Sequence, residues 1–302
     1  MVDAQKIIES GAQFLKGNGE QLKLSLTALL AGKHVLIEDG PGKGKTLLVK
    51  YIGKLFQLDF RRIQFTNDLM PSDIIGFNYY DRTNGQFIFK EGPLFAEILL
   101  TDEINRGSSR TQSALLQAME ERQVSVEDKT FELSPLFCVF ATQNPREQVG
   151  TAALPESQLD RFLLKFKMTD LSSSDELDLL NMGSQHEDIK KFQSTYTKET
   201  LKELKEETLK VQIPQSIKEW IVDFLQASRQ DPEVTPLSSR AGLDFILAIQ
   251  AYAFLSNRKQ VLPEDVVTLF PYCFGHRLYQ NRGYTLQLEQ TQATQWLKKL
   301  KK

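Results

Sequence analysis

Residues 35–46 read VLIEDGPGKGKT, a short apolar run that ends in a glycine-rich turn. Residues 47–56, LLVKYIGKLF, then repeat their apolar side chains at helical spacing. A strand, a glycine loop and a helix in this order predict a P-loop, in which backbone N–H groups and the helix N-terminus together cradle a phosphate. The predicted phosphate-binding residues are Gly40, Pro41, Gly42, Lys43, Gly44, Lys45, Thr46 and Leu47.

Two side chains of this loop have predicted roles. Lys45 would reach the β- and γ-phosphates of ATP, and the Thr46 hydroxyl would ligate Mg²⁺, so ATP and Mg²⁺ are the expected cofactors. The general pattern GxxxxGK[ST] has a glycine where Asp39 stands in this chain. A carboxylate near phosphates lowers affinity unless it points away or is paired, so Asp39 puts the affinity of the loop for nucleotide in question.

The composition disfavours several classes of protein. The chain of 302 residues carries 37 basic and 39 acidic side chains, a net charge of −2, so a nucleic-acid partner is not expected. The sequence has no membrane-spanning apolar run and no signal-peptide pattern, so we expect a cytoplasmic protein. Cys138 and Cys273 lie far apart without metal-ligand spacing, and both are expected to be buried free thiols.

Strand and helix patterns alternate in the first part of the chain, and only helical patterns follow. Two hairpins interrupt the alternating part, one in residues 73–95 around Asn84-Gly85 and one in residues 123–133. From about residue 170 the strand character stops. We therefore predict the α/β class, with a P-loop αβα core carrying β-hairpin insertions over residues 1–170 and a small all-α domain over residues 171–302.

Acidic and amide side chains follow two further apolar runs. Asp102 and Glu103 follow ILLT at residues 98–101. Beside a P-loop, Asp102 would hold Mg²⁺, often through water, and Glu103 would polarise the attacking water. Asn144 ends the run VFATQN. If that strand lies between the first strand and the one ending at Asp102, the amide would lie beside the γ-phosphate and could orient water. The simpler alternatives are solvated turns at both places.

Two arginines are candidates for contact with phosphate charge. Arg161 lies among apolar residues just before a final strand at 163–168 and could act in trans as an arginine finger, although a surface ion pair is the default for a lone arginine. Arg240 lies in the first turn of a predicted helix, where the dipole disfavours a cation, so it is expected to face an anion. The alternative for Arg240 is a salt bridge with Asp244, four residues further on.

Several stretches of the chain resemble the AAA+ ATPases, and within them the MoxR-type family. They read DEINRGSSRTQSALLQAMEERQVSV from residue 102, FATQNPREQVGTAALPESQLDRFLLKF from residue 140, LSSRAGLDFILAIQAYAFL from residue 237 and LPEDV from residue 262. The resemblance covers nearly the whole chain from residue 20. It implies roles for Lys45 and Thr46 (Walker A), Asp102 and Glu103 (Walker B), Asn144 (sensor 1), Arg161 (arginine finger) and Arg240 (lid-borne sensor 2).

The resemblance also implies a function. The family suggests a homo-hexameric ring that hydrolyses ATP with Mg²⁺ and acts as a chaperone-like motor, remodelling or maturing a protein complex. It further implies a protein partner with a von Willebrand factor A-type domain. Both hairpins would project toward the central pore of the ring, where the aromatic side chains of the first could contact a client or could simply pack the hairpin, namely Tyr79, Tyr80, Phe87 and Phe89.

Two other functions stay open at this point. The chain could be a magnesium-chelatase-like ATPase subunit, which is an enzyme of the same branch. It could instead be a nucleotide-gated assembly module, in which Asp39 leaves nucleotide binding but little hydrolysis. Among the remaining polar residues, His34 and His186 show no sequence signal of a partner and are expected at the surface, whereas His276-Arg277 is interpreted as structural.

Overall fold

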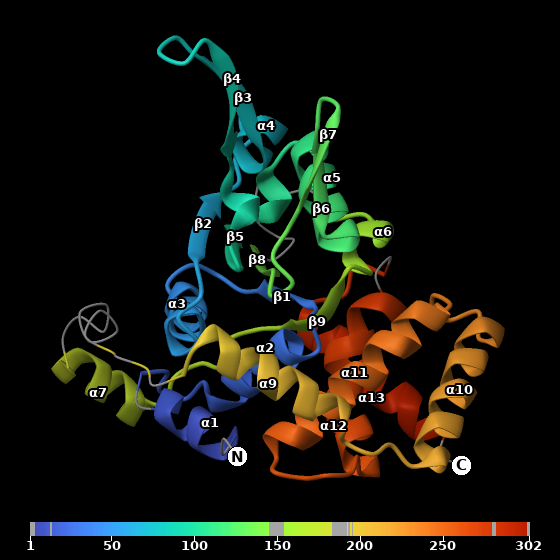
Figure 1. Cartoon of the computed structure of the whole chain (residues 1–302). Helices are drawn as coiled ribbons and strands as arrows, with labels where there is room; N and C mark the ends of the chain where they lie inside the picture. The colour runs from blue at the N-terminus through green and yellow to red at the C-terminus, as the bar shows by residue number, and fades with distance from the viewer. Residues whose placement is uncertain are drawn as a thin grey trace.

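The N-terminal part of the chain is built on a five-stranded parallel sheet with the strand order β2-β5-β8-β1-β9 (Figure 1). The computed structural model describes residues 4–12, 14–144, 154–182, 192, 194, 196–279 and 282–300. Four strands are buried along their whole length, as is usual for parallel strands covered on both faces, and only β2 at the edge is more exposed. The strands are β1 (His34–Glu38), β2 (Phe60–Gln64), β5 (Ile98–Asp102), β8 (Cys138–Gln143) and β9 (Phe162–Phe166).

Helices and hairpins form the connections around this sheet. The predicted α/β class is confirmed, and β8 lies between β1 and β5, as the argument for Asn144 requires. Ser108 caps α5, because its side chain accepts a hydrogen bond from the Thr111 N–H at the start of that helix. The helices are α1 (Ala4–Ala12), α2 (Gly19–Leu30), α3 (Lys45–Leu55), α4 (Pro71–Ile75), α5 (Ser109–Glu121) and α6 (Glu156–Leu159).

Both predicted hairpins are confirmed, and they contact each other. The first consists of β3 (Gly76–Asp81) and β4 (Gln86–Glu91) and extends away from the sheet (Figure 1), and the second consists of β6 (Gln123–Val126) and β7 (Lys129–Glu132). The ring of Phe89 stacks on that of Phe131 with 4.4 Å between centroids, so Phe89 packs the hairpin base as the simpler alternative predicted. Near the tip, Tyr80 and Phe87 are 54% and 73% exposed.

Only helices follow residue 170 in the described part of the chain. Apolar side chains of α2, α3, β1 and β9 share one continuous core with those of the C-terminal helices, and α2 packs against α9 and α11. None of the helices that the structure describes combines the length and apolar character needed to cross a bilayer. The C-terminal helices are α7 (Ser173–Met182), α9 (Lys198–Leu209), α10 (Gln215–Gln230), α11 (Ser239–Leu255), α12 (Pro263–Leu278) and α13 (Leu286–Leu300).

One histidine prediction is wrong and the cysteine prediction is confirmed. His34 is not at the surface. It begins β1, is 3% exposed, accepts the Val139 N–H at Nδ1 and donates from Nε2 to the Met119 carbonyl. Burial lowers its pKa to about 3, so the ring is neutral. His186 lies outside the described residues. Cys138 and Cys273 are buried free thiols, and burial raises the pKa of each to about 12.

Candidate active site

The predicted phosphate loop joins the carboxyl end of β1 to the start of α3. Gly42 and Gly44 have φ values of 80° and 81°, which side chains other than glycine rarely adopt. A Cβ added at either position would meet no atom within 4 Å, so the left-handed turn, rather than crowding, accounts for glycine there. Gly44 caps α3 without a side-chain hydrogen bond, so the first N–H groups of the helix face the loop. This is the cradle that a phosphate requires.

Lys45 is buried within the loop rather than extended into solvent. It is 9% exposed, and its Nζ donates to the carbonyl oxygens of Asp39, at 2.8 Å, and Gly40. Burial lowers the pKa of the Lys45 amine, while the carboxylates of Asp39, Asp102 and Glu103 oppose that shift. An ammonium held here by carbonyl oxygens is in position to exchange them for phosphate oxygens.

The carboxylate of Asp39 is occupied by backbone donors. Its Oδ1 accepts the Gly40 N–H at 2.8 Å, and its Oδ2 accepts the Met168 N–H at 3.1 Å, just beyond β9. Asp39 therefore ties the first turn of the loop to the end of the neighbouring strand. Because both oxygens bind backbone N–H groups, the geometry favours an orientation toward β9 over one toward the phosphates.

Asp102 lies at the carboxyl end of β5 and is held by two side chains. Its Oδ2 accepts from Arg62 Nε at 2.5 Å, and its Oδ1 accepts from the Thr142 hydroxyl at 3.2 Å. The same Thr142 oxygen accepts the backbone N–H of Glu103 at 3.0 Å, so one hydroxyl orients both acidic residues. β5 and β8 are adjacent and parallel, which brings Thr142 to the same edge as the acidic pair.

Glu103 has an unusual backbone and three side-chain partners. Its φ of 54° is uncommon for a residue with a Cβ, and such conformations concentrate at functional sites. Its Oε1 accepts from Asn144 Nδ2 at 3.1 Å, and its Oε2 accepts from Gln64 Nε2 at 2.9 Å and contacts Arg106 Nη1 at 3.1 Å. Two strand ends and the turn after β5 thus converge on one carboxylate.

The sequence interpretation missed several residues of this constellation. Gln64 and Thr142 lie at the carboxyl ends of β2 and β8, and Arg62 lies two residues before Gln64 on β2. Their common signal is position, because all parallel strands of one sheet end at the same edge. Neither an isolated glutamine nor a threonine carries a sequence pattern that would single it out without the strand order.

The donors at this edge fit Mg-ATP. Thr46 offers a hydroxyl in the first turn of α3, and Asp102 offers a carboxylate at the end of β5. Both are oxygen donors, which Mg²⁺ prefers, and this ion commonly takes one or two protein ligands together with phosphate oxygens and water. A cavity of about 440 Å³ extends from the loop between residues 14–18 and 168–171, with Phe14, Leu15 and Leu171 as apolar walls.

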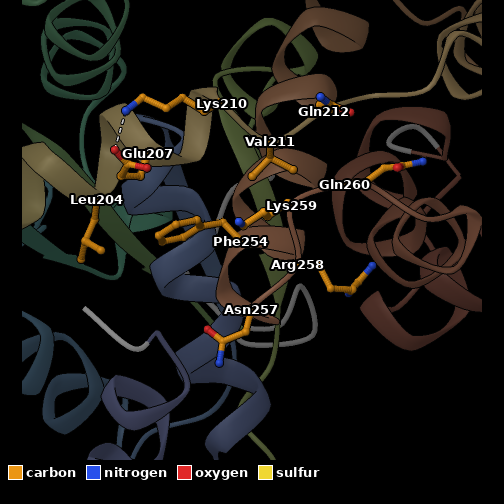
Figure 2. Close-up of a pocket in the computed structure, with 10 residues that line it drawn as sticks. All are labelled: Leu204, Glu207, Lys210, Val211, Gln212, Phe254, Asn257, Arg258, Lys259 and Gln260. Carbon is orange, nitrogen blue, oxygen red and sulfur yellow. Dashed lines mark hydrogen bonds and ion pairs between the residues drawn. The ribbon is translucent and has the colours of Figure 1, made fainter. Parts of the chain in front are cut away.

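A larger cavity of about 790 Å³ lies elsewhere, between α9 and residues 257–260 in the helical region (Figure 2). It is lined by Lys210 and Arg258, but Lys210 pairs with Glu207, and Arg258 pairs with Asp265 through two nitrogens. Two of its three lining cations, the third being Lys259, are thus already paired with carboxylates, and no glycine loop borders the cavity. Its size therefore does not make it the better candidate for a phosphate ligand.

The two candidate arginines lie at the opposite edge of the sheet. Arg161 directly precedes β9, whose first residue pairs with His34 at the start of β1, whereas the phosphate loop follows the end of β1. A five-residue strand spans about 16 Å, so Arg161 is about that far from the phosphate loop of its own chain. Arg240 is at the same edge, because its helix is anchored there by an ion pair of 2.6 Å between Asp244 and Lys33.

Both arginines contact the same carboxylate. Glu120, near the end of α5, accepts from Arg161 Nε at 3.0 Å through Oε2 and pairs with Arg240 Nη1 through Oε1. The alternative pairing of Arg240 with Asp244 is wrong, because Asp244 binds Lys33 instead. Arg161 forms the surface ion pair that was its simpler alternative. Neither arginine is brought to Lys45, Glu103 or Asn144 of its own chain.

The glycine loop, the acidic pair and Asn144 meet at the carboxyl edge of a parallel sheet, and this defines the chain as a P-loop nucleotide-binding protein with a helical C-terminal part. Comparison with known families agrees. Residues 34–164 match the ATPase family associated with various cellular activities (AAA), and residues 233–295 match the AAA lid domain. The chain belongs to the MoxR-type family of AAA+ ATPases.

Relatives cover most of the chain. It is 44% identical over 274 residues to the uncharacterised protein YeaC of Bacillus subtilis, a match that spans 90% of this chain and 86% of that one. It is 36% identical over 278 residues to Chaperone MoxR1 of Mycobacterium tuberculosis, spanning 88% and 73%. A solved structure of a candidate ATPase from Cytophaga hutchinsonii superposes with a TM-score of 0.83 at 34% identity, covering 96% of this chain and 92% of that one.

Proposed function

We propose that this chain hydrolyses ATP in a Mg²⁺-dependent manner and does so as a subunit of a ring, most simply a homo-hexamer. The observation that carries the proposal is the division of the candidate site. Lys45, Glu103 and Asn144 lie at the carboxyl edge of the sheet, and Arg161 and Arg240 lie at the amino edge. A head-to-tail contact between copies would place the amino edge of one against the nucleotide of the next, which is the kind of contact that closes into rings.

Each residue then has a defined task in the reaction. Lys45 binds the β- and γ-phosphates, and Glu103, oriented by Asn144 and Gln64, accepts a hydrogen bond from the attacking water and polarises it. Thr46 and Asp102 would hold the magnesium ion, which supplies charge neutralisation at the phosphate oxygens. Arg161 and Arg240 of the neighbouring copy supply positive charge at the γ-phosphate as it is transferred.

The biological task that fits best is remodelling or maturation of a protein complex. It is supported by the family, by the relative named Chaperone MoxR1, and by the exposed aromatic side chains on the projecting β3–β4 hairpin. We propose in addition that the chain binds a partner protein with a von Willebrand factor A-type domain. The boundary between its α/β domain and its helical domain is proposed to lie near residue 170.

ATP turnover per subunit, measured across a wide range of protein concentration at saturating Mg-ATP, tests this function. A specific rate that rises with concentration is expected, because a lone subunit lacks the arginines of a neighbour. A constant rate together with a monomeric particle on sizing would refute the shared site. Tight ATP binding without turnover at any concentration would favour a nucleotide-gated module, and turnover that appears only with chelatase-type partner subunits would favour the magnesium-chelatase-like alternative.

A further inference from the structure

Glu120 joins three elements that are distant in sequence. It lies on α5, Arg161 lies in the turn between α6 and β9, and Arg240 lies in the first turn of α11 in the helical region. Glu120 Oε2 contacts Arg161 Nε at 3.0 Å and Nη2 at 2.7 Å, and Glu120 Oε1 contacts Arg240 Nη1. The hydrogen bond from Arg240 is the main reason that the pKa of Glu120 is lowered, so the carboxylate is charged at neutral pH.

A purely structural role explains this cluster poorly. The side chains of Glu120, Arg161 and Arg240 are 36%, 25% and 47% exposed. Ion pairs with this much contact with water contribute little to fold stability. Other ion pairs already fix the same region. Arg277 on α12 holds Asp160, the residue before Arg161, through Nε at 2.8 Å, and Lys33 holds Asp244 on α11.

The cluster leaves both guanidiniums able to bind a further anion. A guanidinium has five N–H groups. Arg161 donates from Nε and Nη2 to Glu120 and from Nη1 to the Ser157 carbonyl. These contacts use three of its five N–H groups and leave two. Arg240 contacts Glu120 through Nη1. Two positive charges against one negative charge give the cluster a net positive charge, and that charge faces outward at the edge away from the phosphate loop of its own chain.

We propose that Glu120 is a positioning residue, whose carboxylate holds Arg161 and Arg240 side by side and orients both toward the γ-phosphate of ATP bound by a second copy of this chain. This inference rests on the proposed ring ATPase. Two long side chains fixed before assembly lose less freedom when they engage the phosphate. Without the Glu120 carboxylate, both arginines remain in the chain, but their guanidiniums point toward the γ-phosphate of the neighbouring copy less often. A misplacement of about 1 Å can reduce a rate about 100-fold.

The test compares Glu120→Ala and Glu120→Gln with wild type, and uses Glu121→Gln as the matched control. Glu121 is the next residue on α5, is exposed and contacts Gln117 rather than an arginine. Both Glu120 variants should lower kcat about 10- to 100-fold with little change in KM for ATP, because the phosphate loop is untouched. Glu121→Gln should behave as wild type. Unchanged kcat in Glu120→Ala, or an increase, overturns the proposal.

A mixing experiment separates positioning in trans from any effect inside the subunit. Lys45→Ala subunits lack a working phosphate loop but keep the Glu120 cluster, so they can present ordered arginines to the sites of Glu120→Ala subunits. In an equal mixture, about half of the Glu120→Ala sites should gain a competent neighbour if subunits assemble at random head to tail. The mixture should therefore exceed the activity of either variant alone by several-fold.

The control mixture combines Glu120→Ala with Arg161→Ala, and it should show no such gain because neither subunit presents an ordered arginine pair. Failure of the Lys45→Ala mixture to gain activity would place the effect of Glu120 within its own subunit and overturn the proposal. A wild type that neither hydrolyses ATP nor assembles would instead refute the ring ATPase itself, and this inference with it. A normal wild type beside a normal Glu120→Ala refutes the role of Glu120 alone.

Discussion

Replacing Lys165 with methionine should destabilise the folded chain strongly. Lys165 on β9 is 1% exposed, and its Nζ contacts Glu38 Oε2 at 3.1 Å and Glu289 Oε2 at 2.8 Å. Glu38 and Glu289 are themselves buried. Methionine keeps much of the apolar stem but removes a positive charge that contacts two buried carboxylates. Removing one partner of a buried pair costs about 3–5 kcal/mol, since the remaining charge loses its compensation.

Thermal unfolding followed by circular dichroism measures this effect. A loss of this size should lower the midpoint by roughly 5–15 °C in a chain of this length. Lys167→Met is the matched control, because Lys167 follows on the same segment but is exposed. Adding Glu289→Gln to Lys165→Met should recover part of the loss, because it removes one buried charge. A Lys165→Met midpoint within about 2 °C of the control would refute the reasoning.

Four further predictions concern the candidate site and its support. Glu103→Gln should keep ATP affinity and reduce turnover about 100-fold or more; retained turnover in a steady-state assay would remove Glu103 as the group that activates water. Arg161→Ala, titrated into wild type at constant total protein, should lower activity more than simple dilution does, and a linear decrease would exclude a shared site. Asp39→Gly should leave the Kd for ATP within about threefold of wild type by calorimetry, because the Asp39 carboxylate binds backbone N–H groups; a tenfold tightening would mean that it faces the phosphates. The pKa of His34 is about 3 in the folded chain and near 6.5 in the unfolded chain, so the unfolded chain binds the extra proton as pH falls. The free energy of unfolding should therefore fall by about 2 kcal/mol between pH 7 and pH 5 because of this residue. In denaturant titrations, His34→Gln should show a smaller loss of stability over the same pH range.

Local sequence patterns were sufficient for much of the fold. The P-loop, the order of strands and helices and both hairpins rest on chemistry within a few residues, such as the left-handed Gly85 (φ 68°) in the first hairpin turn and the Ser108 cap of α5. The placement of Asn144 also needed only strand order. Its contact with Glu103 follows once β8 lies beside β5.

The remainder depended on tertiary neighbours that no local pattern contains. Arg240 and Asp244 are correctly spaced for a helix pair, yet Lys33, from a segment two hundred residues earlier, takes Asp244. His34 looked like a polar residue before a strand, but β1 starts one residue earlier than predicted and buries it. The roles of three further residues depend on contacts between elements that are distant in sequence and meet only in the folded chain, namely Gln64, Thr142 and Glu120.

The stack between Phe89 and Phe131 physically connects the two hairpins. β3 contacts α4 at the base of the first hairpin, and β7 is joined through residues 133–137 to β8, whose end is followed by Asn144. The exposed tip at Tyr80 and Phe87 therefore belongs to a hairpin whose base contacts the second hairpin through two aromatic rings. The path from the first hairpin to the hydrogen bond between Asn144 and Glu103 thus consists of one ring pair, the second hairpin, residues 133–137 and β8.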